Sequence, residues 1–455
     1  MTTNSTIRTD GAARAEVPPT LVEAAPRTLG LRAQLGLWGN LGISLLLPVA
    51  ATFIVVQGQS LLATLIAVVV GAVIGSVLLG LVAATGAKTG APAMVLLRGL
   101  FGVRLSFLPT VLNVLQCVGW ATFEVFVIAE AATKLTGGPR WLFVLIAGLL
   151  ATLMALRPLG VVKILAKYAV WLAVISTVYL LVEVLRQPLP PLTEGGFSGF
   201  WTSVDLVIAL PVSWVPLAAD YSRHSRSMKA AFLGSSLGYG VATIAFFVLG
   251  VLALVAFQVQ PGFDVIGALL AVPLAGLALA LLAVDELDEA FANLYSTAVS
   301  VQNLRPRWDR RTLVIVVGIL ATVLALTVDA YGYEPFLFLL GAAFVPLTAT
   351  LLVDFFLLRR RSGRSDWDVS ERAPLRWEML VPWVLGFVTY QLFAPTVFTG
   401  AGAQWTTWWT ARQADLGIPI GWSASLVSLA VAGVLAAVVG LLPLRRSAAR
   451  VGAAA

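Results

Sequence analysis

The sequence is poor in cysteine, histidine and charged residues. One cysteine, Cys117, and one histidine, His224, occur among 455 residues. A single cysteine excludes an intramolecular disulfide and a multi-cysteine metal site, and the lone histidine excludes an HExxH zinc motif. Only 12% of the residues are charged, whereas 59% are hydrophobic. This composition excludes an ordinary soluble protein and indicates a polytopic membrane protein.

Long hydrophobic runs fill most of the chain. Runs able to cross about 30 Å of hydrocarbon predict a helix bundle with about twelve transmembrane helices, an all-α polytopic fold class. The predicted spans are residues 35–57, 60–84, 106–133, 141–157, 161–185, 201–221, 231–258, 270–300, 312–328, 334–358, 378–398 and 421–443.

The basic residues predict the orientation. With the N-terminus in the cytoplasm, 26 of the 30 Lys and Arg residues fall in cytoplasmic segments, and only Lys134, Arg140, Arg186 and Arg412 do not. By the positive-inside rule both termini are expected in the cytoplasm, in a cytoplasmic (plasma, or cell inner) membrane. The net charge of +7 is therefore a topology signal and not evidence of nucleic-acid binding. The polar N-terminus lacks the features of a signal peptide.

Two predicted spans carry helix-breaking residues. Gly42 and Pro48 interrupt the first span, and Pro211 and Pro216 interrupt the sixth. Breaks five spans apart, in spans of opposite orientation, are typical of two inverted five-helix repeats with a binding site between them. The expected division is a disordered cytoplasmic N-tail (1–34), the two repeats (35–186 and 187–358), a basic cytoplasmic loop (359–377), accessory helices eleven and twelve (378–443) and a cytoplasmic C-tail (444–455).

An acidic segment follows the uncharged run of residues 267–284. Asp285, Glu286, Asp288 and Glu289 fall on one half of a helix surface. An ionised carboxylate at mid-membrane costs about 2.5–3.5 kcal/mol on insertion scales, so this face is expected to point at water, a cation or partner groups. The acidic face therefore predicts an ion or substrate pathway. The alternative is that residues 267–284 already span the bilayer and the acidic helix lies outside it.

A polar stripe follows one face of the third span. Asn113, Gln116, Trp120 and Glu124 are spaced by three, four and four residues. An indole face beside amide and carboxyl groups suits a planar heterocycle, so this stripe predicts a substrate site. For Trp120 the alternative is packing, and for Glu124 it is a structural role with a buried partner or as a protonated, hydrogen-bonded carboxyl.

Three segments resemble the nucleobase:cation symporter-1 family, and within it the prokaryotic purine and cytosine permeases. They are TGAKTGAPAMVLLRGLFG (residues 85–102), GWATFE (119–124) and LPVSWVPLAADYSRHSRS (210–227). The last contains Asp220, Tyr221 and Arg223, which resemble the family's D-Y/F-x-R signature. The resemblance runs from about residue 35 to 358.

The resemblance implies a LeuT-type fold of 5+5 inverted repeats plus two accessory helices. It implies a substrate site between spans one, three, six and eight, and a cation site between the first break and span eight. The implied substrate-binding residues are Trp120, Glu124, Trp214 and Asn293, to which the polar stripe adds Gln116 and the interrupted first span adds Asn40. The implied cation-coupling residues are Gly42, Ser44, Asp288, Glu289 and Asp285, with Na⁺ at Asp288 as one option. Asp220 and Arg223 are expected to be structural or gating residues.

Two positions depart from the family pattern. Glu124 stands where relatives usually have Gln, and Asp288 stands near where sodium-coupled relatives offer hydroxyl groups. Since a carboxylate can bind Na⁺ or carry a proton, the coupling ion stays open between Na⁺ and H⁺.

The expected function is secondary active import of a cytosine- or purine-like base by cation symport through alternating access. The alternatives are a permease of the same fold for another nitrogen heterocycle (a thiamine precursor such as hydroxymethylpyrimidine, or an allantoin-like compound), a cation channel and an intramembrane enzyme. The leading interpretation involves no catalysis, no cofactor beyond the coupling ion, no nucleic acid and no obligate protein partner. Its partners are the small substrate and the lipid bilayer.

Overall fold

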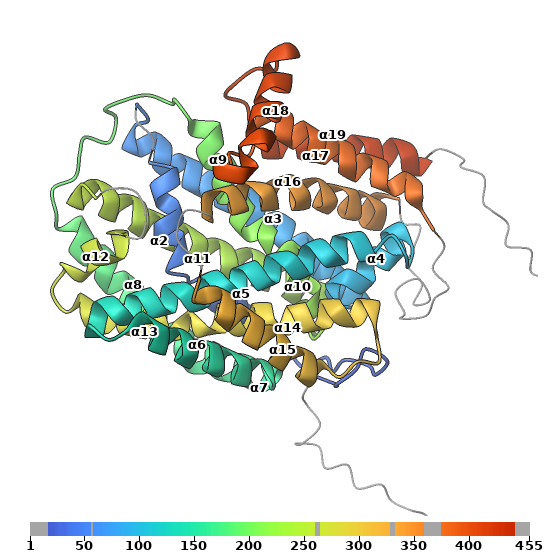
Figure 1. Cartoon of the computed structure of the whole chain (residues 1–455), viewed down its shortest axis with the longest axis horizontal. Helices are drawn as coiled ribbons and strands as arrows, with labels where there is room; N and C mark the ends of the chain where they lie inside the picture. Colours follow the sequence, from blue (N-terminus) through green and yellow to red (C-terminus); the bar gives the residue numbers. More distant parts are fainter. Residues whose placement is uncertain (1–16, 56–57, 260–263, 328–332, 359–374, 442–455) are drawn as a thin grey trace, which may run out of the picture.

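The computed structural model describes residues 17–55, 58–259, 264–327, 333–358 and 375–441. In this part of the chain the regular structure is helical, with only isolated β-bridges besides (Figure 1). The predicted C-tail, most of the basic loop 359–377 and the first half of the N-tail lie outside the described residues.

The helices follow the predicted spans closely. From the N-terminus they are α1 (Leu31–Asn40), α2 (Leu46–Ala50), η1 (Ala51–Phe53), α3 (Leu61–Thr89), α4 (Ala93–Phe101), α5 (Phe107–Thr136), α6 (Arg140–Ala155), α7 (Pro158–Ile164), η2 (Leu165–Ala169), α8 (Val170–Leu185), α9 (Phe200–Ser213), α10 (Val215–Ser222) and α11 (Met228–Phe257). The second half of the chain contains α12 (Asp264–Leu270), α13 (Ala275–Asp285), α14 (Leu287–Leu304), α15 (Arg310–Ala325), α16 (Tyr333–Leu352), η4 (Val353–Leu357), η6 (Trp377–Met379), α17 (Leu380–Phe393), η7 (Gly400–Gly402), α18 (Ala403–Asp415) and α19 (Ala424–Leu441).

Seven helical stretches of the described residues are long and apolar enough to cross a membrane. They are Leu61–Thr89, Phe107–Thr136, Pro158–Leu185, Phe200–Ser222, Met228–Phe257, Tyr333–Leu357 and Ala424–Leu441. The other predicted spans form shorter or interrupted helices. The all-α polytopic fold class predicted from the hydrophobic runs is therefore confirmed.

The breaks predicted in the first and sixth spans are present. The first span is α1 and α2 separated by residues 41–45, and the sixth is α9 and α10 separated at Trp214. A third break, which no proline or glycine in the sequence indicates, separates α13 from α14 at Glu286. Each break leaves backbone groups without their helical partners, and these groups need other acceptors or donors.

The interrupted helices lie in the middle of the bundle. The sixth span packs against α3, and α3 also packs against α11, while α14 packs against α5. In Figure 1, α5 crosses the front of the molecule, with α16, α17 and α19 above it and α6, α7 and α15 below it. The accessory helices α17 and α19 pack on α16 at one side of this bundle.

The expectation of a disordered N-tail is wrong for residues 17–30. The Pro19 carbonyl accepts hydrogen bonds from the Gln302 side chain at 2.7 Å and from the Arg310 amide at 3.0 Å. The Leu29 amide donates to the His224 carbonyl at 2.9 Å, and the Leu29 side chain is buried. The polar composition of the tail hid these contacts because most of them use backbone groups.

Asp205 joins the sixth span to the last helix. Its carboxylate, on α9, accepts hydrogen bonds from the Ser423 hydroxyl at 2.5 Å and from the Ala424 and Ser425 amides at 2.7 and 3.1 Å. These amides are unpaired donors at the N-terminus of α19, where a negative charge is favourable. A buried carboxylate thus fixes an accessory helix to a helix of the predicted second repeat.

Candidate functional site

The candidate site lies where the break of the first span faces the third break. Glu286 accepts a hydrogen bond from the Ser44 hydroxyl at 2.6 Å and one from the Leu45 amide at 2.7 Å. The amide is one of the donors that the interruption between α1 and α2 leaves free. Glu286 therefore caps the break of the first span with a side chain from the break between α13 and α14.

A second contact between these elements lies one turn away. The side-chain amide of Asn40, the last residue of α1, donates to Asp288 at 2.6 Å and to Asp285 at 3.1 Å. All three side chains are buried. Carboxylate and amide oxygens are the donors that Na⁺ and other hard cations take, and a carboxylate can also carry a proton. The predicted coupling residues Asp285 and Asp288 thus share one neutral partner.

Three glutamates form a further cluster. Carboxylate oxygens of Glu124, Glu286 and Glu289 lie within 4.8 Å of one another, and all three residues are buried. Like charges at this separation in a membrane interior are strongly unfavourable unless a cation or protons offset them. The cluster is therefore suited to take up positive charge, either as an ion or on a substrate.

A small cavity adjoins the glutamate cluster, with room for about one water molecule. It is lined by Ser44, Leu46, Leu47, Trp120, Glu124, Leu210, Trp214, Tyr239, Glu289 and Asn293. These residues come from the first, third, sixth, seventh and eighth spans. Six of these residues were predicted for the substrate or cation site: Ser44, Trp120, Glu124, Trp214, Glu289 and Asn293.

The cavity contains polar atoms without partners. Among the described residues, neither carboxylate oxygen of Glu124 has a hydrogen-bond donor, and the indole N–H of Trp120 has no acceptor. Both side chains are buried. Unpaired buried polar groups cost about 1–3 kcal/mol each, so the cavity favours a guest that supplies N–H donors and an acceptor.

Aromatic rings surround the cavity. The Trp120 ring meets Phe336 with centroids 5.3 Å apart and an interplanar angle of 68°. The Trp214 ring meets Trp38 at 6.0 Å and Tyr239 at 5.9 Å. These edge and tilted ring contacts fix both indoles at the wall of the cavity.

Gln116 lies on the predicted polar face but does not line the cavity. Its amide nitrogen donates to the Asn113 carbonyl oxygen at 2.7 Å and to the Ser213 backbone carbonyl at 3.0 Å. The second bond satisfies a carbonyl at the break between α9 and α10. The structure therefore gives Gln116 a role in holding the sixth span, and its contact with substrate stays a prediction.

Asn293 and Gly42 differ in their relation to the site. The Asn293 side chain lines the cavity and donates to the Glu289 backbone carbonyl at 3.0 Å. Gly42 packs against α11, where an added Cβ would lie 2.8 Å from the Ala242 Cβ and 2.9 Å from the Tyr239 carbonyl. The structure explains Gly42 by close helix packing, and its predicted part in cation coupling stays a prediction.

The predicted gating residues lie apart from the cavity. Asp220 accepts a hydrogen bond from the Ala93 amide, the first of α4, at 2.9 Å. The Arg223 guanidinium donates to the Tyr295 hydroxyl on α14 at 3.0 Å. Each ties the end of α10 to a neighbouring helix, consistent with the expected structural role.

Besides apolar lining residues, sequence reasoning missed Glu286 and Tyr239. Glu286 was recognised as part of the acidic face but was not assigned a role, because nothing in the pattern indicated a helix break there. Tyr239 lines the cavity from the seventh span. The only sequence feature that could have indicated this role is the presence of a tyrosine, with its polar hydroxyl, within an apolar run.

Comparisons with known proteins find related permeases. A family model described as "Permease for cytosine/purines, uracil, thiamine, allantoin" matches residues 21–389. A cytosine permease from Escherichia coli (strain K12) is 28% identical over 306 residues, which are 64% of this chain and 69% of that protein. A cytosine permease from Escherichia coli O157:H7 is 27% identical over the same length.

Solved structures share the fold. Mhp1, described as a nucleobase-cation-symport-1 family transporter in a closed conformation with bromovinylhydantoin bound, superposes with a TM-score of 0.71 at 20% identity over 94% of each chain. A Na⁺-coupled sialic acid symporter superposes with a TM-score of 0.60 at 12% identity, covering 91% of this chain and 90% of that one. This likeness confirms the LeuT-type fold class that the sequence resemblance implied.

Proposed function

The chain belongs to the family of permeases for cytosine/purines, uracil, thiamine and allantoin, and on that premise we propose that it imports a cytosine- or purine-like base by cation symport. The observation that carries the proposal is the cavity between the interrupted spans. It combines two indole walls with a carboxylate whose oxygens have no donor among the described residues. The cytosine permeases among the relatives support the choice of base.

The chemistry of recognition follows from these unpaired groups. The two oxygens of Glu124 can accept hydrogen bonds from adjacent N–H groups of an aminopyrimidine or purine. The Trp120 indole supplies a flat apolar face and an N–H that donates to a ring nitrogen or carbonyl. A base that meets both residues relieves their unsatisfied hydrogen bonds, which favours it over an apolar ring of equal size.

The coupling cation is assigned to the contact between the first span and the eighth. Asn40, Asp285 and Asp288 form one part of this contact, and Ser44 with Glu286 forms the other. Positive charge at these carboxylates offsets their mutual repulsion and strengthens the contact between the two spans. Na⁺ at Asp288 and a proton on the same carboxyl both fit this chemistry. No cofactor besides this ion is proposed.

Transport requires the site to open on alternate sides. The described cavity has room for about one water molecule, so a base enters only when the surrounding helices separate. The three helix breaks at this level supply backbone that can change conformation without unwinding whole spans. The distribution of Lys and Arg supports cytoplasmic termini and residence in the cytoplasmic membrane, with the bilayer and the substrate as partners.

Uptake by purified protein in liposomes tests the proposal. Labelled cytosine is offered under an inward sodium gradient and, separately, an inward proton gradient, with purines, pyrimidines, hydroxymethylpyrimidine and allantoin as competitors. Saturable uptake that one gradient drives and that cytosine or a purine blocks most strongly is expected. Block only by hydroxymethylpyrimidine or allantoin favours the second candidate, a permease for another heterocycle, which the breadth of the family supports. Absence of saturable uptake under either gradient contradicts the proposal.

A further inference from the structure

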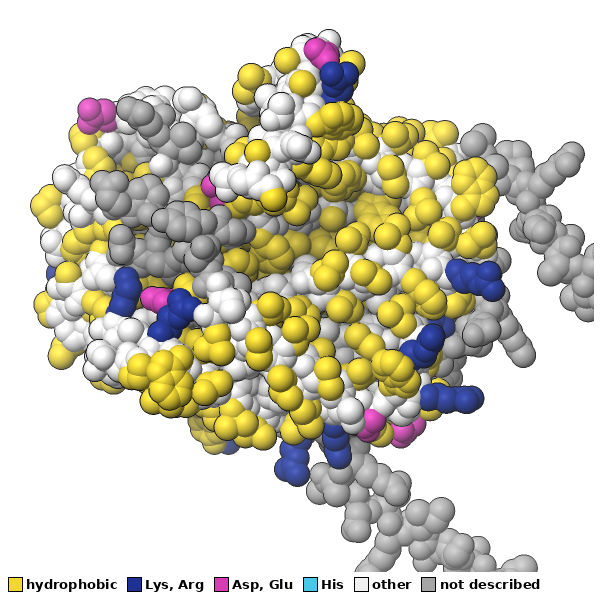
Figure 2. Space-filling view, viewed as in Figure 1, with side chains coloured by type: hydrophobic (Ala, Val, Ile, Leu, Met, Phe, Trp, Pro, Cys, Tyr) yellow, Lys and Arg dark blue, Asp and Glu magenta, His cyan; other side chains and the backbone are white. Residues whose placement is uncertain are grey.

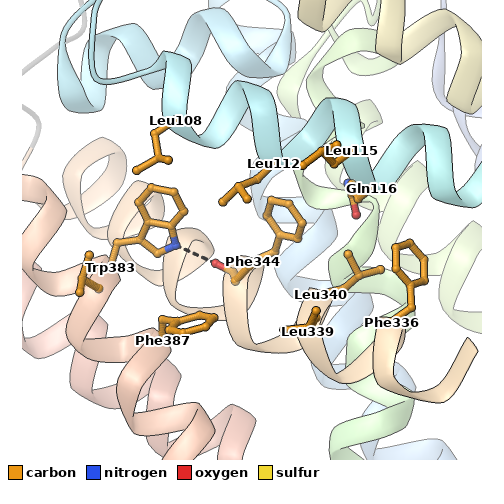
Figure 3. A pocket seen from close by; sticks show the side chains of 12 residues that line it. Leu108, Leu112, Leu115, Gln116, Phe336, Leu339, Leu340, Phe344, Trp383 and Phe387 are labelled. Atoms are coloured by element: carbon orange, nitrogen blue, oxygen red, sulfur yellow. Dashed lines mark hydrogen bonds between the residues drawn. The ribbon is translucent and has the colours of Figure 1, made fainter. Parts of the chain in front are cut away.

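A second cavity lies on the outer surface of the helix bundle. It has a volume of about 450 Å³ and lies between α5, α16 and α17 (Figure 3). We call this cavity the outer groove. It is lined by Leu108, Leu112, Leu115, Gln116, Phe336, Leu339, Leu340, Ala343, Phe344, Trp383, Val384 and Phe387. Gln116 is the single polar residue of this lining. The groove thus has the size of a small-molecule site and almost no means of binding a polar molecule.

The outer groove is continuous with the surface that faces lipid. Leu108, Leu115 and Val384 on its rim are 49%, 63% and 49% exposed. Two of its walls are stretches apolar enough to cross a membrane, Phe107–Thr136 and Tyr333–Leu357. Figure 2 shows hydrophobic side chains over this face and a hollow among them. In a bilayer the medium at this opening is hydrocarbon, so its natural occupant is an acyl chain.

The shape of the groove suits one chain lying along the helices. Leu108 and Leu115 are seven residues apart on α5, which corresponds to about 10 Å along the helix axis. Figure 3 shows Trp383 near Leu108 at one end and Phe336 near Gln116 at the other, with Leu112 and Phe344 between them. The groove is thus an elongated apolar slot.

A positive charge lies near the Leu108 end. Arg104 is exposed in the turn before α5, and its backbone carbonyl accepts from the Phe107 amide at 3.2 Å. The positive-inside pattern places this turn in the cytoplasm, where an arginine meets the phosphates of the inner leaflet. Arg104 complements the phosphate of an anionic phospholipid whose chain enters the groove from this end.

The far end of the groove shares a wall with the candidate site. Phe336 lines the groove, and its ring lies 5.3 Å from Trp120 and 5.6 Å from Phe123 between centroids. A chain in the groove would pack on Phe336, the residue whose ring contacts Trp120. It would therefore limit the movement of Phe336 away from the indole.

We propose that the outer groove binds an acyl chain of an anionic membrane phospholipid, with the phosphate at Arg104 and the chain end against Phe336. An acyl chain that packs into a groove of this size makes closer van der Waals contacts with the protein than it makes with neighbouring lipid chains in the bilayer. The site adds a lipid ligand to the molecule and holds in place the ring behind Trp120. Binding at the groove does not depend on the identity of the transported substrate.

Photo-crosslinking tests the proposal without a transport assay. The full chain is placed in liposomes that contain phosphatidylglycerol with a photoactivatable group at the end of one acyl chain, and labelled peptides are mapped. Labelling concentrated on the groove segments of α5, α16 and α17 is expected, with loss of that labelling in Leu112→Trp, whose indole fills the slot. Leu149→Trp is the matched control, because Leu149 is 60% exposed on α6 and lies outside the groove; it should leave the groove labelling unchanged.

A surface variant keeps the proposal testable if Leu112→Trp fails to fold. Arg104→Gln should abolish the preference for labelled phosphatidylglycerol over labelled phosphatidylcholine at the groove, while uptake persists. Labelling spread evenly over lipid-facing positions, including the region of Leu149, would overturn the proposal. Unlabelled groove peptides together with a dimer in native mass spectrometry would also overturn it, because a second copy would then cover the groove.

Discussion

The carboxylate of Glu286 lies 2.7 Å from the amide nitrogen of Leu45, so the break between α13 and α14 caps the break between α1 and α2. The two residues are far apart in sequence and belong to different predicted repeats. A movement of one repeat against the other therefore has to break or carry along this hydrogen bond. The contact links the predicted cation site to the backbone of the first span.

Replacing Glu286 should affect both stability and uptake. In Glu286→Ala the Leu45 amide and the Ser44 hydroxyl lose a charged acceptor, a loss of about 1.5–3 kcal/mol for a hydrogen bond to a charged group. We expect a lower thermal midpoint and strongly reduced uptake, and a smaller loss in Glu286→Gln, which keeps one acceptor oxygen. Glu183→Gln, at the exposed ion pair with Arg186, is the control and should leave both unchanged. An unaltered thermal midpoint in Glu286→Ala would show that the cap is not needed.

Replacing Asp288 should uncouple uptake from the ion. The amide of Asn40 donates to Asp288 at 2.6 Å, and an asparagine at position 288 keeps the shape but not the charge. In Asp288→Asn we expect substrate to equilibrate across the liposome membrane without being concentrated, whichever gradient drives the native protein. Asp415→Asn is the control, because Asp415 pairs with Arg412 at the surface of α18. If Asp288→Asn still concentrates substrate against a gradient, the coupling group lies elsewhere.

The sequence predicted the spans and two of the three breaks because both depend on local chemistry. Hydrophobic runs of membrane length and prolines within them are visible in the chain without any knowledge of packing. The break at Glu286 has no proline or glycine beside it, and the Ser44 and Leu45 groups that it binds come from another span. Because the fold alone brings these partners to Glu286, the sequence around Glu286 contains no local signal of the break.

Some residues of the candidate site could likewise be predicted from the sequence, whereas the contacts of others could not. The spacing of Trp120 and Glu124 puts them on one face, and the resemblance to a family identified Asn293 and Trp214. Gln116 shares the face of Trp120 but turns to the Ser213 carbonyl, a difference that depends on where the sixth span unwinds. The ordered contacts of residues 17–30 also escaped prediction, because backbone hydrogen bonds carry no composition signal.

Replacing Asp205 should weaken the fold without weakening substrate binding. In Asp205→Ala the N-terminus of α19 loses the acceptor of three hydrogen bonds, and loss of a helix cap costs about 0.5–2 kcal/mol. We expect a lower thermal midpoint and an unchanged dissociation constant for substrate. Asp205→Asn should show an intermediate thermal midpoint. A changed dissociation constant with an unchanged midpoint would contradict this assignment.

The turn at His224 predicts a pH dependence of stability. Burial, together with the positive charge of the neighbouring Arg223, lowers the pKa of His224 to about 3. The neutral ring faces the Pro26 carbonyl, with Nδ1 2.8 Å from it. Because the unfolded chain binds a proton near pH 6.5 and the folded chain does not, the native state loses stability as the pH falls from about 6.5 towards 3.

The measurement is the thermal midpoint of the purified protein between about pH 8.5 and about pH 4.5, roughly two units above and below the pKa of free histidine. The midpoint of the native protein should fall on acidification more than that of His224→Asn, whose amide can donate to Pro26 in the same way. Parallel curves for the two proteins would show that His224 does not titrate on unfolding as described.

The most direct test of the account is the dissociation constant of cytosine, or of the base that competes best in the uptake assay, for the native protein, Trp120→Ala and Glu124→Gln. Loss of stacking on an aromatic residue costs about 1–3 kcal/mol per base, so Trp120→Ala should weaken binding by about fivefold or more. Glu124→Gln should also weaken it, since an amide offers one acceptor where the carboxylate offers two. Trp171→Ala, with a side chain 65% exposed on α8, should bind as the native protein does. Unchanged affinity in both site variants, each folded and inserted, would contradict the assignment of this cavity as the substrate site.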